Sequence, residues 1–175
     1  MRQIKKVAVT TISIALALSL TSCYGAGPNA ATRMINRVTD GNEGDVNTAG
    51  SNLRVDNVLL VETEDGSGVL VGQVVNRAAE TDQIIGISVN GIQAVVTGET
   101  VLRTNKPVRF EGETANAKAV IPALGAPAGT HVLVSIGFAR GGLVTMEAIV
   151  RDKRDIYANV TTGAKLSTPE ATPAK

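Results

Sequence analysis

Apolar and polar residues alternate with a period of two through most of this 175-residue chain. Eight short segments show this pattern, each bounded by Gly, Pro, Asn or charged residues: Leu53 to Val61, Val69 to Val75, Ile84 to Val89, Ile92 to Val96, Val108 to Glu111, Ala117 to Ile121, His131 to Phe138 and Leu143 to Val150. No segment shows a convincing helical period. Short strands separated by regular turn signals predict an all-β sandwich or barrel.

Two hairpins can be tested for internal consistency. The first closes at Asn90-Gly91, the strongest two-residue turn signal, and pairs Val89 with Ile92, Ile87 with Ala94 and Ile85 with Val96. The second closes at Arg140-Gly141-Gly142 and pairs Phe138 with Val144, Ile136 with Met146, Val134 with Ala148 and Val132 with Val150. Every pair is apolar. A slip of one residue would turn these side chains to the other face, so the agreement supports both hairpins.

The predicted fold is an immunoglobulin-like or cupredoxin-like sandwich of seven to nine antiparallel strands over roughly residues 51–160. The chain is 43% hydrophobic but has only two Phe, two Tyr and no Trp. Its core must therefore be built from Val, Ile, Leu and Ala. The Cys and Trp hallmarks of true immunoglobulin domains are absent from the sequence, so the likeness is one of architecture.

The N-terminus has the three regions of an export signal, and residues 1–22 are predicted to be a lipoprotein signal peptide. Arg2, Lys5 and Lys6 precede an apolar run from Val7 to Leu20, which small residues follow. The run is short for a membrane span of about 20 residues, and its flanks favour a cleaved signal. No later segment is long and apolar enough to span a bilayer.

Cys23 is the only cysteine, and it stands at the end of this signal. The four residues Leu20-Thr21-Ser22-Cys23 resemble the bacterial lipobox, in which the thiol is diacylated and the chain is cut just before it. A buried core thiol is the alternative, but the neighbouring residues offer no core pattern. Because two acyl chains hold a protein stably where one holds marginally, a lipidated Cys23 would keep the protein at the outer face of the cytoplasmic membrane.

Polar segments flank the predicted sandwich. Residues 23–50 are rich in Gly, Asn, Thr and Ala and predict a flexible tether, and residues 161–175 predict a disordered tail. The chain has 17 basic and 16 acidic residues, a balance that speaks against a nucleic-acid-binding surface.

The pattern as a whole resembles a known family. A lipobox, a polar tether, a strand pair around EDGSG, a Val-rich sandwich and a closing RDKRDIYANV segment are similar to actinobacterial lipoproteins of the LpqE type. That family is related in fold to periplasmic copper chaperones of the PCuAC type. The resemblance implies a sandwich of that fold, a palmitoylated anchor and a possible role in copper handling.

The residues do not supply the expected copper ligands. The resemblance implies His and Met ligands with a close His-x-Met spacing, which suits Cu(I), but this chain has one His and no such motif. Met34 lies in the tether. Met146 pairs with Ile136 in the predicted hairpin, about 16 Å from His131 and on the opposite face. We therefore predict no metal site and no cofactor.

Other chemistry is equally poorly supported. Catalysis by a nucleophile would have to use His131 or an acylated Cys23. The DGNEGD stretch from Asp40 resembles a calcium loop, but Ser51 stands where the twelfth-position Glu belongs. The loops Glu64 to Gly68, Arg77 to Asp82 and Pro122 to Gly129 are candidate contact loops at one end of the sandwich. Arg140, Arg151, Lys153 and Arg154 are a candidate basic strip, with solvated strand ends as the alternative.

The sequence predicts a non-catalytic binding or scaffolding module of the cell envelope. Its expected partners are the membrane, through Cys23, and an envelope protein or polymer, with no nucleic acid. The alternative is a copper-handling, metallochaperone-like protein with degenerate ligands.

Overall fold

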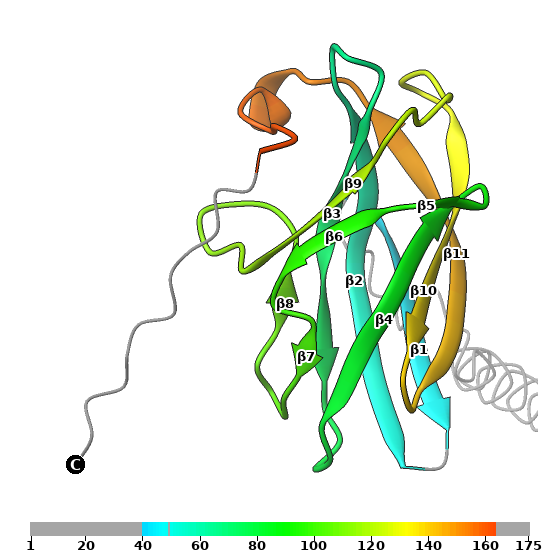
Figure 1. Ribbon diagram of the computed structural model, residues 1–175, viewed down its shortest axis with the longest axis vertical. Helices are drawn as coiled ribbons and strands as arrows, with labels where there is room; N and C mark the ends of the chain where they lie inside the picture. Colours follow the sequence, from blue (N-terminus) through cyan, green and yellow to red (C-terminus); the bar gives the residue numbers. More distant parts are fainter. Residues whose placement is uncertain (1–39, 49, 164–175) are drawn as a thin grey trace, which may run out of the picture. The chain divides into compact units, whose positions relative to one another are not determined.

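The structure is a computed structural model that describes residues 40–48 and 50–163. These residues form eleven strands and one short 3-10 helix, Asp155–Tyr157 (Figure 1). The strands are β1 (Asn42–Thr48), β2 (Ser51–Glu62), β3 (Gly68–Asn76), β4 (Asp82–Val89), β5 (Ile92–Gln93), β6 (Val95–Gly98), β7 (Val101–Leu102), β8 (Val108–Arg109), β9 (Ala117–Ile121), β10 (His131–Phe138) and β11 (Gly142–Arg151). The predicted all-β class is confirmed. The predicted signal peptide, Cys23 and most of the two predicted tails lie outside the described residues.

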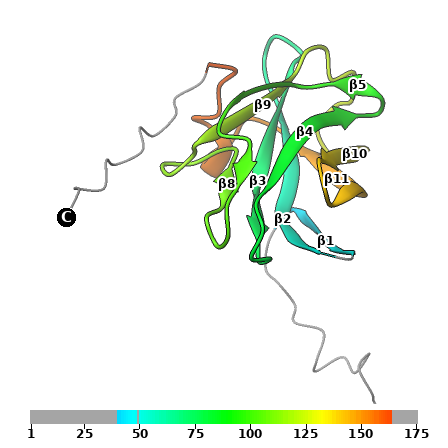
Figure 2. The ribbon, with the colours of Figure 1, turned by 60° about the horizontal axis from the view of Figure 1, so that its bottom comes forward.

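Two layers of sheet form the domain. Hydrogen bonding runs in the order β5-β4-β10-β11-β2-β3-β9-β6, with β1 on β2, β7 on β4 and β8 on β3. One layer holds β5, β4, β10 and β11, and the other holds β1, β2, β3, β9 and β6 (Figures 1 and 2). The strand pairs are antiparallel except β11 with β2, where Val150 lies beside Leu60. This parallel contact joins the two layers along one side.

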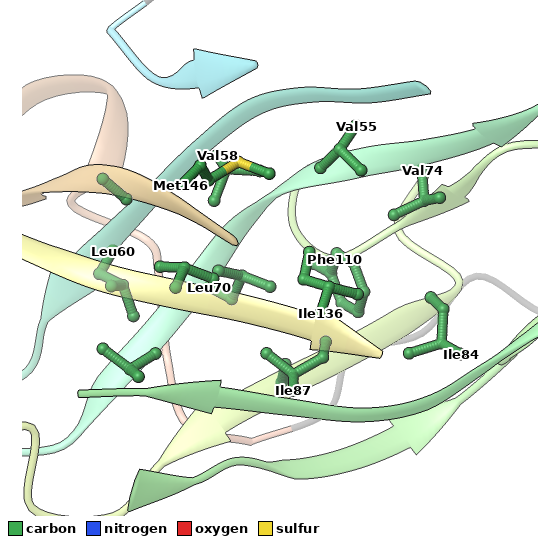
Figure 3. Packing of buried hydrophobic residues seen from close by; sticks show 14 of the residues in the cluster. Val55, Val58, Leu60, Leu70, Val74, Ile84, Ile87, Phe110, Ile136 and Met146 are labelled. Atoms are coloured by element: carbon green, nitrogen blue, oxygen red, sulfur yellow. The ribbon is translucent and has the colours of Figure 1, made fainter. Parts of the chain in front are cut away.

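The core lies between the layers and consists mostly of aliphatic side chains, as the composition predicts. Every second residue of β10 points inward, from Val132 to Phe138. Phe110 is the largest fully buried side chain, and Figure 3 shows it within the cluster that includes Leu70 and Ile136. Burial of each such side chain contributes about 1.5–3 kcal/mol.

The β4–β5 hairpin follows the predicted register only near its turn. Val89 pairs with Ile92, and the Ala94 N–H donates to the Ile87 carbonyl at 2.8 Å, as expected. The predicted pairing of Ile85 with Val96 is wrong, because β6 leaves β4 and pairs with β9, placing Val96 opposite Ala119. The chain thus crosses from one layer to the other within this short segment.

A bulge in β4 also changes which residues face the core. Gly137 pairs with Gly86 while Phe138 pairs with Ile84, so Ile85 is the extra residue. Ile84 is buried, whereas the Ile85 side chain points to solvent and is 67% exposed. The sequence alone predicts Ile85 on the apolar face, since an unbroken period of two connects it with Ile87 and Val89.

The β10–β11 hairpin is shifted by two residues from its predicted register. Phe138 pairs with Gly142 and Val134 with Met146, so the loop is residues 139–141. Gly142 has a φ of +80°, the left-handed conformation that closes many three-residue hairpin loops. A shift of two residues keeps every side chain on its predicted face, so the inward set is still correct.

The domain begins earlier than the predicted boundary at residue 51. Residues 42–48, predicted to belong to the tether, form β1 and pair with β2. Only Val46 of this strand is buried, so the strand carries little hydrophobic signal. Gly44 lies against Met146, since a Cβ at Gly44 would be 2.8 Å from Met146 Cε. The backbone ladder and this close approach hold β1 in place.

The two ends of the described chain contact each other. The 3-10 segment after β11 brings Tyr157 and Val160 onto an apolar group on β2 and β3 that includes Leu59 and Val69. Asp40 forms an ion pair with Arg151 at 2.9 Å and accepts a hydrogen bond from the Tyr157 hydroxyl at 3.3 Å.

Candidate functional site

The residues tested for metal binding do not meet in the structure. His131 is exposed at the start of β10, and Met146 is buried in the core on β11. Met146 pairs with Val134, three residues and roughly 10 Å along β10 from His131, and it points to the opposite face. The distance in the sequence analysis was too long because of the two-residue shift, but the two side chains still cannot share an ion. Cys23 and Met34 lie outside the described residues.

Within residues 40–48 and 50–163, no group of three or more His, Cys, Asp and Glu side chains is arranged to hold a metal ion. A search of the same residues finds no helix of the length and apolar character needed to cross a membrane.

The three candidate contact loops do not lie at one end of the sandwich, contrary to prediction. The loop of residues 64–68 and the loop of residues 122–129 are neighbours, since the Leu124 N–H donates to the Gly66 carbonyl at 2.9 Å. The loop of residues 77–82 lies at the other end, where the Arg140 N–H donates to Asp82 at 2.9 Å. A single strand, β3, connects the loop of residues 64–68 to the loop of residues 77–82, so these two loops must emerge at opposite ends (Figure 1).

The first of these loops is an ordinary polar turn. Asp65 accepts hydrogen bonds from the Thr63 hydroxyl at 2.6 Å and from the Ser67 N–H at 3.2 Å. These bonds, that from Thr63 first, lower the pKa of the Asp65 carboxyl below its usual value. The carboxylate accepts hydrogen bonds from donors of its own turn, as Asp side chains in turns commonly do.

The predicted basic strip does not form. Arg140 belongs to the β10–β11 loop. Arg151 is the last residue of β11, a ten-residue strand about 30 Å long, and Lys153 and Arg154 follow it, so these three lie at the other end of the strand. Each of the four has an acidic partner: Arg140 with Glu80, Arg151 with Asp40, Lys153 with Glu64 and Arg154 with Asp152. Partnered charges at strand ends match the alternative given with the strip.

Three exposed apolar side chains lie on the outer face of β4, β10 and β11. Ile85, Leu133 and Leu143 are 67%, 49% and 70% exposed. Ile85 lies over Gly137, with its Cγ1 3.3 Å from where a Cβ would be, and Leu143 pairs with Gly137 from the other side. We call these three residues the outer apolar surface. The bulge in β4 creates it by turning Ile85 outward, a known effect of bulges.

The middle of the same face is uncharged. Ser135 lies between Ser88 of β4 and Thr145 of β11, and the Ser135 and Thr145 hydroxyls are 3.1 Å apart. Small hydroxyl side chains thus separate Leu133 from the Ile85 and Leu143 pair. An apolar patch with an uncharged centre is typical of the core of an interface.

Polar networks occupy the outer face of the other layer. The Arg54 side chain is only 11% exposed and contacts Glu43 at 2.7 Å, Asp56 at 2.5 Å and Asp45 at 3.5 Å. Lys118 is buried and contacts Glu111 at 2.7 Å. None of these residues stands out in the sequence. The one local signal is Gly72, an isolated glycine within β3, which is typical of a bulge in the strand.

Comparison with known proteins places the fold in a class, that of PCuAC-like β-sandwiches. One solved structure, described as "Apo PCuAC domain from PmoF1", matches with a TM-score of 0.53 and 17% identity, over 63% of this chain and 99% of that chain. Another, "Copper-bound PCuAC domain from PmoF2", matches with a TM-score of 0.53 and 19% identity, over 63% and 98%. No family model and no curated protein matches the chain. The sandwich that the resemblance implies is thus confirmed, and at this identity the likeness is one of fold.

Proposed function

We propose that this protein is a non-catalytic binding module of the cell envelope and that it docks a partner protein on the outer apolar surface. The observation that carries the proposal is the exposure of Ile85, Leu133 and Leu143 on one sheet face, whose centre of Ser88, Ser135 and Thr145 is uncharged and whose charged residue, Glu147, pairs with Leu133 at one edge of the group. Large apolar side chains gathered on one exposed face typically mark an interaction site. A polar residue at any of the three positions would leave the core intact.

A photoreactive amino acid placed at Leu143 tests this docking surface in cells. The matched control is the same amino acid at Val95, which is 59% exposed on β6 in the other layer. We expect one discrete cross-linked product from position 143, reduced by Leu133→Asp, and none from position 95. Equal cross-linking at the two positions would contradict the proposal.

The proposed location is the outer face of the cytoplasmic membrane, reached through a lipid on Cys23. The lipobox residues and the resemblance to lipoproteins of the LpqE type support it. Intact-mass analysis of the membrane fraction is the test. We expect cleavage before Cys23 plus two or three acyl chains in the wild type, and an unprocessed, unmodified Cys23→Ala variant. An unmodified thiol in the wild type would rule out the anchor.

Copper handling is the second candidate function, and the comparison of folds favours it more directly than it favours docking. One structural neighbour is described as copper-bound. The described residues do not fit a Cu(I) site, since His131 and Met146 lie on opposite faces. Any copper site would therefore have to recruit ligands such as Met34 from outside the described residues.

Competitive Cu(I) titration of the full-length protein separates the two candidates. Tight binding that His131→Ala or Met34→Leu weakens would establish copper handling. Affinity no greater than that of a simple thioether peptide would remove it and leave the docking proposal standing. The cross-linking experiment does not depend on copper, so the two results can be read independently.

A further inference from the structure

A shallow pocket of about 200 Å³ opens on the outer face of β2, β3 and β8. It is lined by Asp56, Asn57, Val71, Gly72, Gln73, Arg109 and Glu111. It belongs to the layer that does not carry the outer apolar surface, so an inference about it is independent of the proposed docking function.

A bulge between β2 and β3 makes the floor of this pocket. The register skips from Asp56 opposite Gln73 to Leu59 opposite Val71, so two residues of β2 face Gly72. Gly72 has a φ of +141°, and a Cβ there would lie 3.0 Å from the Asp56 carbonyl oxygen. Both facts require glycine at this position. The backbone of β2 therefore lies close against Gly72 at the floor of the pocket.

The segment after β8 supplies one wall. The Phe110 N–H donates to the Gly72 carbonyl at 3.0 Å, and the Phe110 ring is buried in the core. Arg109, the last residue of β8, and Glu111, in the bend that follows, flank Phe110, and both line the pocket. One buried aromatic ring thus positions two charged side chains of opposite sign.

The two acids of the pocket already have cations beside them. Asp56 contacts Arg54 at 2.5 Å, and Glu111 contacts the buried Lys118 at 2.7 Å. Arg109 differs, because its contact is a hydrogen bond of 3.3 Å from Nε to the neutral Gln73 amide oxygen. Among the residues that the structure describes, no carboxylate forms an ion pair with Arg109.

We propose that this pocket binds a small zwitterion of the α-amino acid class, with the ligand carboxylate on Arg109 and the ligand ammonium toward Glu111 and Asp56. Gln73 holds Nε, which leaves the two terminal nitrogens of the guanidinium to face a carboxylate in the two-bond geometry that Arg favours. The carboxylates of Glu111 and Asp56 accept hydrogen bonds from an ammonium. The ligand class follows from this juxtaposition of one guanidinium and two carboxylates.

Charge and size argue against other ligands. A phosphate or dicarboxylate would gain Arg109 but would bring a second negative charge with no unpaired cation in the pocket to offset it, because Arg54 and Lys118 are already paired with Asp56 and Glu111. A simple cation would be repelled by the positive charge of Arg109. The pocket volume of about 200 Å³ accommodates a small amino acid and excludes an oligomer lying within it.

Titration of the ¹⁵N-labelled full-length protein with glycine, at constant ionic strength, tests the proposal. We expect saturable shifts of the backbone amides of Gly72, Gln73 and Arg109. Acetate and methylammonium each carry half of the ligand and should bind about tenfold more weakly than glycine. Equal affinity for acetate and glycine would overturn the zwitterion assignment.

Variants of Arg109 give the second arm of the test. Arg109→Gln should weaken glycine binding about tenfold or more. Arg109→Lys should weaken it less, because lysine keeps the positive charge and lacks only the planar, two-donor geometry of the guanidinium. Arg103→Gln is the matched control, since Arg103 pairs with Glu99 at 2.8 Å away from the pocket. Unchanged glycine affinity in Arg109→Gln and Arg109→Lys, or no saturable shift in the wild type, would overturn the proposal.

Discussion

Asp82 is a buried carboxylate that attaches the β10–β11 loop to β4. It accepts hydrogen bonds from the N–H groups of Gln83, Arg140 and Gly141 at 2.7, 2.9 and 2.9 Å. Asp82→Ala leaves these donors without their acceptor, and the Gly141 N–H is buried. We expect the free energy of unfolding to fall by about 2–3 kcal/mol, measured by urea denaturation.

A charged residue at the surface provides the control for Asp82. The Asp152 side chain is 40% exposed and pairs with Arg154 on the same segment, so Asp152→Ala should change the free energy of unfolding by less than about 0.5 kcal/mol. A similarly small fall in the free energy of unfolding for Asp82→Ala would show that other contacts hold the β10–β11 loop.

The buried pair of Lys118 and Glu111 predicts an asymmetric response to substitution. Lys118 is 4% exposed, so Glu111→Gln leaves a buried ammonium without its carboxylate and should cost about 3 kcal/mol of unfolding free energy. Lys118→Met removes the buried charge and leaves the more exposed Glu111 to water, so its cost should be smaller. Urea denaturation of both variants measures the order, and the reverse order would contradict this account of the pair.

At the scale of elements, substitutions at Ile84 and Ile85 distinguish the observed bulge in β4 from the unbroken strand predicted from the sequence. Ile84 is buried and Ile85 is 67% exposed. Ile84→Ala should lower the free energy of unfolding by about 2–4 kcal/mol, whereas Ile85→Ala should change it by less than about 0.5 kcal/mol. Thermal or urea unfolding measures both. A larger fall in the free energy of unfolding for Ile85→Ala than for Ile84→Ala would contradict the bulge and support the uninterrupted alternation of Ile85, Ile87 and Val89.

The sequence predicted most strands and their inward faces, and the failures have physical causes. Alternation identifies a face, but it does not distinguish registers two residues apart, and both Gly141 and Gly142 were available to close the β10–β11 loop. The strand β1 was not predicted, because Val46 is its only buried residue. It is stabilised by pairing with β2 and by the contacts of Arg54, which no local pattern reveals.

The candidate sites were less predictable than the strands. The outer apolar surface depends on a one-residue bulge at Ile85, and a bulge reverses the face of a side chain without changing its hydrophobicity. The pocket depends on Arg109 and Glu111 meeting Asp56, from which more than 50 residues of sequence separate them. Gly72 gave a local hint, but the partner strands that complete the pocket are set by tertiary pairing.

At the scale of the whole molecule, the topology separates the surfaces that carry the two proposals. The outer apolar surface belongs to the layer of β4, β10 and β11, and the pocket to the layer of β2 and β3. A partner docked on one layer would leave the other open to a small ligand. Substitutions at Leu143 and Arg109 should therefore act independently, as distant sites without shared contacts do.

The contact between the two ends of the described chain predicts a pH dependence of stability. Burial, and then the charge and hydrogen bond of Asp40, raise the pKa of the Tyr157 hydroxyl above its usual value, while Arg151 opposes this effect. A raised pKa means that the folded state holds the proton more tightly than the unfolded state. The stabilisation is complete below the unfolded pKa of about 10 and is lost as pH rises through the higher folded pKa.

Wild type and Tyr157→Phe should therefore diverge in alkaline solution. Urea midpoints measured across the pH range should run parallel below about pH 10, and above it the wild type should lose stability more steeply, because phenylalanine has no proton to release. Subtracting the two curves removes the titration of lysines, which both proteins share. Parallel curves throughout would mean that Tyr157 ionises equally in both states, and that Asp40 and Tyr157 do not couple the two ends of the domain.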